Sequence, residues 1–155
     1  MGRAKASISV PGRAAEAEAL WYDPHRWQAW IDGFGHVVSL SDGWPARGAE
    51  LVWDSPPGGR GRVVERVVVY EMRTGQTLEV EDATMTGRQT VKFEPGPETV
   101  EVTLSLEYRI KDRTPLTPLV DLLFVRRAMG DALRRTVTRF ANERKAEIQF
   151  GPDRG

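Results

Sequence analysis

Cysteine is absent from this chain, and histidine occurs only as His25 and His36. The lack of cysteine excludes disulfide bonds, catalysis by a thiolate and cysteine-based metal sites. A zinc site would have to rely mainly on carboxylates, and no acid–base pair of carboxylates stands out in the sequence. We therefore predict neither a metal nor a cofactor.

An excess of either charge is also missing, because 22 basic residues balance 22 acidic ones. Proteins that bind nucleic acids usually carry a basic domain or stripe, so the balance argues against such a partner. No apolar run approaches the ~20 residues that cross a bilayer, and the N-terminus lacks the apolar segment of a signal peptide. We expect a cytoplasmic protein without stable membrane insertion.

The first part of the chain indicates one strand followed by two short helices. Residues 5–10 alternate between apolar and polar side chains and predict a strand that Pro11 and Gly12 end. Residues 13–22 are rich in Ala and Glu, which favour helix. A second short helix follows Asp23, a residue suited to the N-cap, and carries Trp27 and Trp30 on one apolar face.

From residue 36 to 111 the apolar residues recur with a period of two, as in strands. The last run is the clearest, since its apolar residues share one parity and its polar residues share the other, which predicts one dry and one wet face. Turns rich in Gly and Pro separate the runs. We expect strands at 36–40, 49–54, 62–72, 76–84, 86–94 and 98–111.

The period returns to 3.6 residues from about 119 to 147. One apolar stripe contains Leu119, Leu122, Met129, Leu133, Val137 and Phe140. A helix of roughly 28 residues is about 40 Å long and needs an equally long surface, which the dry face of the sheet supplies. We therefore predict an α+β fold in which a curved antiparallel sheet of six to seven strands wraps around this helix. The expected single domain covers 3–148, and 149–155 form a loose tail.

Three local sequences, in this order of elements, resemble the START-like (SRPBCC) superfamily of helix-grip proteins, and its polyketide cyclase/dehydrase-like branch in particular. They are the segment from Leu20 to Trp30, the Gly-rich turn before Arg62–Glu65, and the segment from Leu122 to Arg127. The resemblance implies an internal cavity between sheet and helix. It also implies an apolar ligand, such as a lipid or polyketide, and in some members cyclisation or dehydration in the cavity. It transfers no catalytic residue to this chain.

Aromatic and polar residues on the predicted dry faces are candidates for the lining of that cavity. The aromatic ones either contact a ligand or simply fill the core. Asp82 and Gln89 share the parity of the dry face, where they orient a ligand or pair with other polar groups, unless the strand ends curl into solvent. The candidate ligand-binding residues are Trp30, Trp53, Tyr70, Asp82, Gln89, Phe93, Tyr108, Arg126, Met129 and Leu133.

Arg126 falls near the centre of the apolar stripe of the long helix. A buried guanidinium is costly unless it is paired, so Arg126 pairs within the protein, extends to solvent, or meets an anionic group of a ligand. Arg144 has the same angular position but lies near the helix end, where we expect it to reach solvent.

Three functions remain open from the sequence. The dry face is poor in catalytic groups, which favours binding of a hydrophobic or amphipathic small molecule over catalysis. The alternatives are a cyclase or dehydratase in which Arg126, Tyr70, Tyr108 or Asp82 act on the substrate, and a protein-interaction module with a collapsed cavity. Valines occupy both parities of the 62–72 strand, so the facing of Glu65 is ambiguous. Two apolar faces indicate that the outer face is covered, and a homodimer is one way to cover it.

Overall fold

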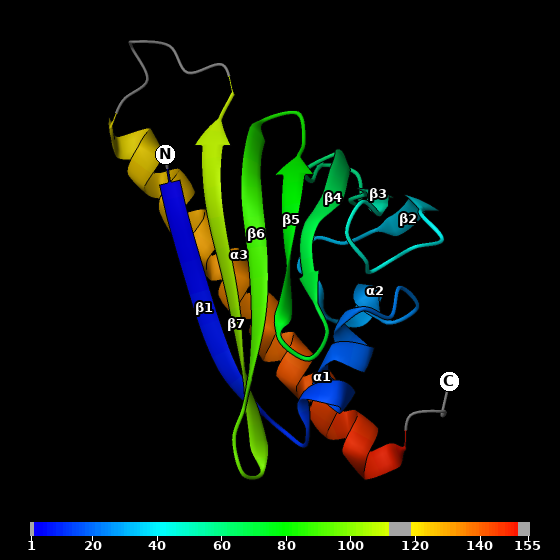
Figure 1. Cartoon of the computed structure of the whole chain (residues 1–155). Coiled ribbons are helices and arrows are strands. Elements are labelled where there is room, and N and C mark those ends of the chain that lie inside the picture. The colour runs from blue at the N-terminus through cyan, green and yellow to red at the C-terminus, as the bar shows by residue number, and fades with distance from the viewer. Residues whose placement is uncertain (1, 112–118, 152–155) are drawn as a thin grey trace.

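The protein forms a sheet with one long helix against it, in a computed structural model that describes residues 2–111 and 119–151 (Figure 1). For residues 119–122 it describes the backbone only. The elements in chain order are β1 (Gly2–Pro11), α1 (Ala14–Trp21), α2 (Trp27–Trp30), β2 (His36–Leu40), β3 (Glu50–Asp54), β4 (Arg62–Glu71), β5 (Gly75–Glu81), β6 (Met85–Pro95), β7 (Thr99–Ile110) and α3 (Leu119–Phe150).

All seven strands form one antiparallel sheet in the order β1-β7-β6-β5-β4-β3-β2. Strands β2 to β7 follow one another as a meander, and β1 joins its end beside β7. The alternation in β7 is as expected, with its even-numbered residues from Val100 to Tyr108 buried. The predicted α+β fold, with two short helices after the first strand, is confirmed.

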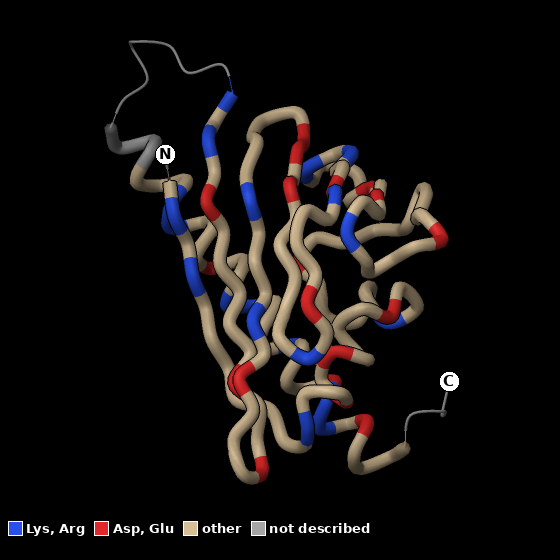
Figure 2. Tube along the Cα trace, in the orientation of Figure 1, with Lys and Arg blue, Asp and Glu red and all other residues tan. Residues whose placement is uncertain are grey.

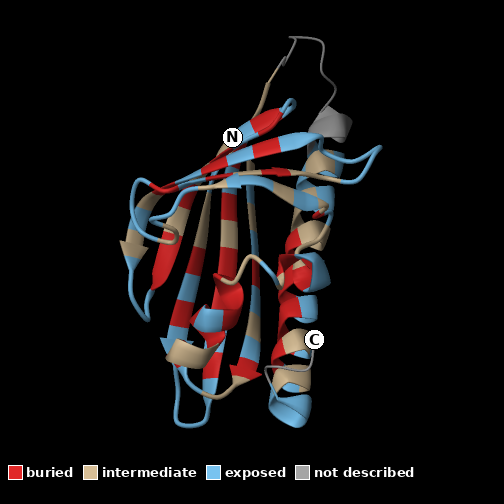
Figure 3. Cartoon of the chain, turned by 90° about the vertical axis from the view of Figure 1, so that its right-hand side faces the viewer, coloured by how far each residue is buried: buried red, intermediate tan, exposed pale blue. Residues whose placement is uncertain are grey.

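Helix α3 lies along the dry face of the sheet, and Figure 3 shows its buried residues turned toward the strands. Leu133, Val137 and Phe140 form the centre of this contact. The helix ends at Phe150, and the domain bounds 3–148 stay a prediction. The structure does not describe the side chains of Leu119 and Leu122, which we expect in the apolar stripe. Residues 152–155 of the predicted tail also lie outside the described residues.

Arg144 does not reach solvent, contrary to our expectation, since only 4% of it is exposed. Its guanidinium donates to the Pro11 carbonyl at 3.2 Å and to the carboxylates of Glu16 at 2.8 Å and Glu147 at 3.1 Å. The expectation is wrong because β1 and α1 cover this end of α3 and supply acceptors. Arg144 therefore ties α3 to the β1–α1 junction.

A second buried charge joins α1 to the turn between β4 and β5. Glu18 accepts a hydrogen bond from the backbone N–H of Arg73 at 2.8 Å and forms an ion pair with the same residue's guanidinium. Arg73 has a φ of 67°, a left-handed conformation that is unfavourable for a residue with a side chain. The Glu18 carboxylate holds the turn in this conformation.

Strand β4 presents Val63, Glu65 and Val67 to the interior, which settles the facing that the sequence left open. The register with β5 shifts between Val67 and Val69, so the alternation of β4 is interrupted there. Val69 is 54% exposed on the outer face. The homodimer stays a prediction.

Charges of both signs are interspersed along the strands (Figure 2). On the outer face, Glu79 of β5 bridges Arg66 of β4 at 3.3 Å and Arg88 of β6 at 3.6 Å. None of the helices within 2–111 and 119–151 is long and apolar enough to span a bilayer.

Candidate functional site: an internal cavity

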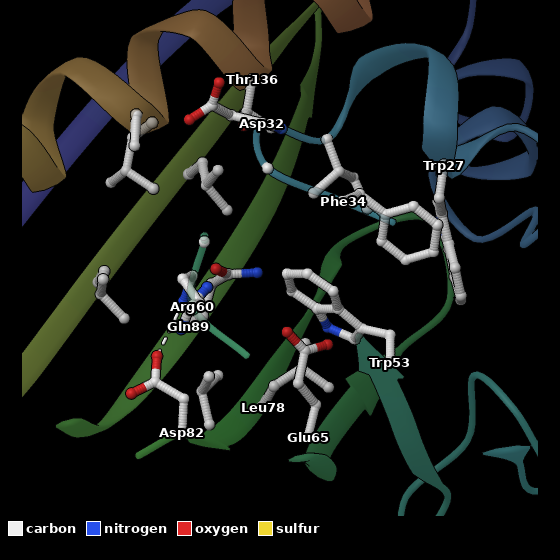
Figure 4. A pocket seen from close by; sticks show the side chains of 18 of the residues that line it. Trp27, Asp32, Phe34, Trp53, Arg60, Glu65, Leu78, Asp82, Gln89 and Thr136 are labelled. Carbon is white, nitrogen blue, oxygen red and sulfur yellow. Dashed lines mark hydrogen bonds and ion pairs between the residues drawn. The ribbon is translucent and has the colours of Figure 1, made fainter. Parts of the chain in front are cut away.

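A cavity of about 550 Å³ lies between the sheet, α2 and α3 (Figure 4). This volume is within the range of small-molecule sites in proteins. Its rim consists of exposed residues of the β3–β4 loop, the α2–β2 loop, the β5–β6 turn and α3. The lining includes Trp27, Trp30, Ile31, Phe34, Trp44, Leu51, Trp53, Leu78, Val80, Met85, Leu104, Leu106, Met129, Ala132 and Leu133.

Aromatic side chains form one wall of the cavity and are fixed by their own contacts. The ring centroids of Trp27 and Trp44 are 5.4 Å apart, and those of Phe34 and Trp53 are 5.1 Å apart. The Trp27 indole donates to the carbonyl of Trp21 at 2.8 Å, so its polar atom is satisfied away from the cavity. The buried indole nitrogen of Trp30, in contrast, has no partner among the described residues.

The α2–β2 loop is attached to α3 through Asp32. Its backbone N–H donates to the Thr136 hydroxyl at 3.0 Å, and its carboxylate accepts hydrogen bonds from Arg135 and Arg139 at 3.0–3.1 Å. These contacts hold this part of the rim on the helix.

A second link crosses the rim between Arg60 of the β3–β4 loop and Asp82 after β5. Arg60 Nε donates to Asp82 Oδ2 at 2.8 Å, and the guanidinium carbon lies 5.6 Å from the centre of the Trp53 ring. Asp82 also accepts hydrogen bonds from the backbone N–H groups of Thr84 and Met85. Burial acts to raise the pKa of Asp82, but the donors of Thr84 and Arg60 outweigh it, and the pKa falls below its ordinary value.

Glu65 of β4 is the most unusual residue of the lining, since it is 8% exposed and its carboxyl group faces the cavity beside Trp53 (Figure 4). Burial raises its pKa from 4.5 to about 7, and the Trp53 indole and the charge of Arg60 offset only part of this effect. Glu65 makes no ion pair with any residue that the structure describes. It is thus an acid that changes charge near neutral pH.

The lining includes part of the predicted set, which the structure brings together from β3, β5, β6, α2 and α3. Trp30, Trp53, Gln89, Met129 and Leu133 all line the cavity, as does Asp82. Asp82 is already paired with Arg60 rather than with Arg126. Their contact with a ligand stays a prediction.

Three predicted aromatic residues lie outside the lining. Phe93 packs with Trp21 and Tyr22, with centroid distances of 6.2 Å to each, and Tyr70 packs on Tyr22 at 5.8 Å. Tyr108 is buried at the β1 side of the sheet, where its ring fills the space above a glycine of β1. These side chains fill the core, which was the alternative interpretation of the aromatic pattern.

Arg126 is exposed and lies outside the lining, so of the three possibilities that the sequence left open the structure supports extension to solvent. Leu123 and Phe124 are exposed as well, and the first buried residue of α3 beyond them is Leu133. Val125 and Met129 in these turns are half-buried against the core, so the helix meets the core here through a narrower face that leaves Arg126 outside. A helical period gives the angle of a residue but not the width of the covered face at that level of the helix.

Sequence reasoning missed Glu65, Arg60 and Trp27 as parts of the lining. The parity of Glu65 with Val63 and Val67 was a signal, but valines at both parities of β4 hid it. Arg60 lies in a glycine-rich loop whose path no periodicity predicts. Trp27 lies on the apolar face of α2, a position that fits a core residue as well as a lining residue.

The comparison with protein families agrees with this geometry. Residues 1–144 match the family described as polyketide cyclase / dehydrase and lipid transport. The chain belongs to this family. None of the curated proteins matches the chain.

Several solved structures share the fold of this chain at low sequence identity. A START superfamily protein from Mycobacterium smegmatis has a TM-score of 0.73 at 12% identity, covering 94% of this chain and 98% of that one. TTHA0849 from Thermus thermophilus has a TM-score of 0.72 at 16% identity, covering 93% and 97%. DynU16, from the dynemicin biosynthetic locus, has a TM-score of 0.64 at 18% identity and 97% coverage of this chain. The match spans 48% of DynU16, about half its length.

Within the described ranges, this family member has no cluster of three or more His, Asp or Glu residues that could hold a metal ion.

Proposed function

We propose that the protein binds a hydrophobic or amphipathic small molecule, of lipid-like or polyketide-like character, in the internal cavity. The observation that carries the proposal is the preformed space of about 550 Å³ with its largely apolar and aromatic lining. Burial of apolar surface contributes about 25 cal/mol per Å², so a ligand that fills such a space gains most of its affinity from the lining. Membership in a family described by cyclisation, dehydration and lipid transport supports the same class of ligand.

Filling the cavity from within tests this function. Ala132 of α3 lines the cavity, so Ala132→Phe places a ring in the ligand space, whereas Asn142→Phe adds the same ring at an exposed position of the same helix. Uptake of the neutral fluorescent probe N-phenyl-1-naphthylamine should fall at least tenfold in the first variant and stay unchanged in the second. The proposal would be contradicted if Ala132→Phe took up as much probe as the wild-type protein, or if the wild-type protein took up none.

A second candidate, acid–base catalysis on a polyketide-like substrate, is favoured by Glu65 alone. Its pKa of about 7 suits a group that accepts and returns protons at neutral pH. The residues first considered for catalysis support it less, because only Asp82 of that group lines the cavity. A poly-β-ketone substrate should be converted by the wild-type protein and at least a hundredfold more slowly by Glu65→Gln. Equal rates would eliminate this candidate.

The third function considered, an interaction module, requires a collapsed cavity. The space between sheet and helix gives it no support.

A further inference from the structure

The charges around the cavity are unequal. Among the described residues, its lining contains three acidic residues, Asp32, Glu65 and Asp82, and one basic residue, Arg60. Asp32 is neutralised from outside the cavity by Arg135 and Arg139, and Asp82 by Arg60. Glu65 is the remaining acid, and no ion pair satisfies it within the described residues.

Apart from Arg60, whose charge offsets only part of the effect of burial, the described surroundings of Glu65 contain no group that could neutralise it. Leu51 of β3 and Val80 of β5 lie opposite Glu65 in the sheet register. Among the described side chains, α3 adds Ala128, Met129, Ala132, Leu133 and Thr136 to the lining, and none of these titrates. The charged groups of the other lining segments are those of Arg60, Asp82 and Asp32, and the Arg60 guanidinium is held by Asp82.

We propose that the cavity selects amphiphiles that carry one protonated amine, with the Glu65 carboxylate as the counter-ion and the aromatic wall around the apolar body. This inference rests on the proposed function and specifies its ligand. An ammonium group supplies the charge that the buried carboxylate lacks, and aromatic faces attract cations. A ligand carboxylate would meet a like charge in a medium of low dielectric constant, where repulsion is strong.

Three probes that share a twelve-carbon chain separate the charge from the apolar contribution. Dodecylamine, dodecanol and dodecanoate, each below its micelle concentration, compete with N-phenyl-1-naphthylamine for the cavity at pH 8. We expect dodecylamine to bind at least tenfold more tightly than dodecanol, and dodecanoate at least tenfold more weakly. Binding of dodecanol without a preference for the amine would overturn the selectivity and leave the proposed function intact. Binding of none of the probes would overturn both.

Two isosteric variants of β4 assign the preference to one carboxyl group. Glu65→Gln should bind dodecylamine and dodecanol within about threefold of each other, and retained dodecanol binding shows that its cavity is intact. Glu71→Gln removes an exposed carboxyl group from the same strand and should keep the wild-type preference. A Glu65→Gln protein that still prefers the amine tenfold would contradict the proposal.

The pH dependence of the wild-type protein supplies a test that needs no variant. Protonation of Glu65 below about pH 7 removes the counter-ion while the alkylamine stays charged. Dodecylamine affinity should therefore fall by at least threefold, toward that of dodecanol, as the pH drops from 8 to 5, with dodecanol affinity constant. An amine affinity that does not change between pH 8 and pH 5 would contradict the role of Glu65.

Discussion

At the scale of single residues, Glu65 introduces an unfavourable interaction into the interior of the protein. A carboxylate without a counter-ion loses its hydration when it is buried, so the folded protein favours the protonated form. The pKa is raised from 4.5 to about 7 in the folded state. Burial of Glu65 therefore lowers the free energy of unfolding least below pH 4.5, and it lowers this free energy more as the pH rises through 7.

Replacement of this carboxyl group by an amide should stabilise the ligand-free protein, and more so at high pH. From the raised pKa we expect Glu65→Gln to add about 2 kcal/mol more to the free energy of unfolding at pH 8 than at pH 5. Urea titrations at both pH values, followed by tryptophan fluorescence, measure the difference. Glu71→Gln should leave it unchanged, and equal effects of the two variants would show that Glu65 is hydrated in the folded state.

Single buried charges were also where sequence reasoning was weakest. Arg126 and Arg144 have the same angular position on α3. The sequence left open whether Arg126 pairs within the protein, extends to solvent or meets a ligand, and it predicted that Arg144 reaches solvent. The structure exposes Arg126 and buries Arg144. The difference arises from what covers each level of the helix: β1 and α1 supply acceptors around Arg144. Contacts between segments more than a hundred residues apart are not encoded in a local period.

At the scale of elements, the Arg144 contacts join α3, α1 and the end of β1. Arg144→Met keeps an unbranched apolar stem and removes the guanidinium, leaving the Pro11 carbonyl and Glu16 without this donor. We expect a loss of about 1–3 kcal/mol in the free energy of unfolding, since hydrogen bonds that involve charged groups contribute this much. Denaturant unfolding measures it. Lys145→Met, at an exposed neighbouring position, should change stability by less than about 0.5 kcal/mol.

The link between Arg60 and Asp82 joins two segments of the rim. Its loss should change the rates of ligand association and dissociation more than the ligand affinity. In Arg60→Gln the β3–β4 loop loses its ion pair to the β5–β6 turn and its contact over Trp53. We expect association and dissociation of N-phenyl-1-naphthylamine to accelerate at least threefold each, as measured by stopped-flow fluorescence. The control is Arg62→Gln, which removes an exposed ion pair to Asp54 that lies outside the lining. Unchanged rates in Arg60→Gln would mean that ligands enter elsewhere.

Elements with a clear period were predicted to within a few residues, because one-sided burial leaves its pattern in the local sequence. β7 and α3 are examples, and the strand order follows from a meander with short turns. The cavity was inferred from the family resemblance, since periodicity does not distinguish an empty core from a filled one. Its rim comes from loops, whose positions depend on contacts such as that of Asp32 with α3.

At the scale of the whole molecule, ligand binding raises the free energy of unfolding. A ligand that binds only the folded state, at a concentration a hundred times its dissociation constant, adds about 2.7 kcal/mol to stability. For a chain of this length the melting temperature should rise by about 5–10 °C. Thermal unfolding with and without dodecanol measures the shift, and Ala132→Phe should show none. An equal shift in that variant would place binding outside the cavity.

The position of α3 in the chain affects how the protein is made. All seven strands precede the helix that covers them, so the ribosome synthesises the entire dry face before its cover exists. During that interval the growing chain exposes a broad apolar surface with unfinished pairing, a state that favours aggregation and recruits chaperones. The cavity is completed only when α3 docks, so a ligand present in the cell at that moment can be enclosed as the last helix closes over it.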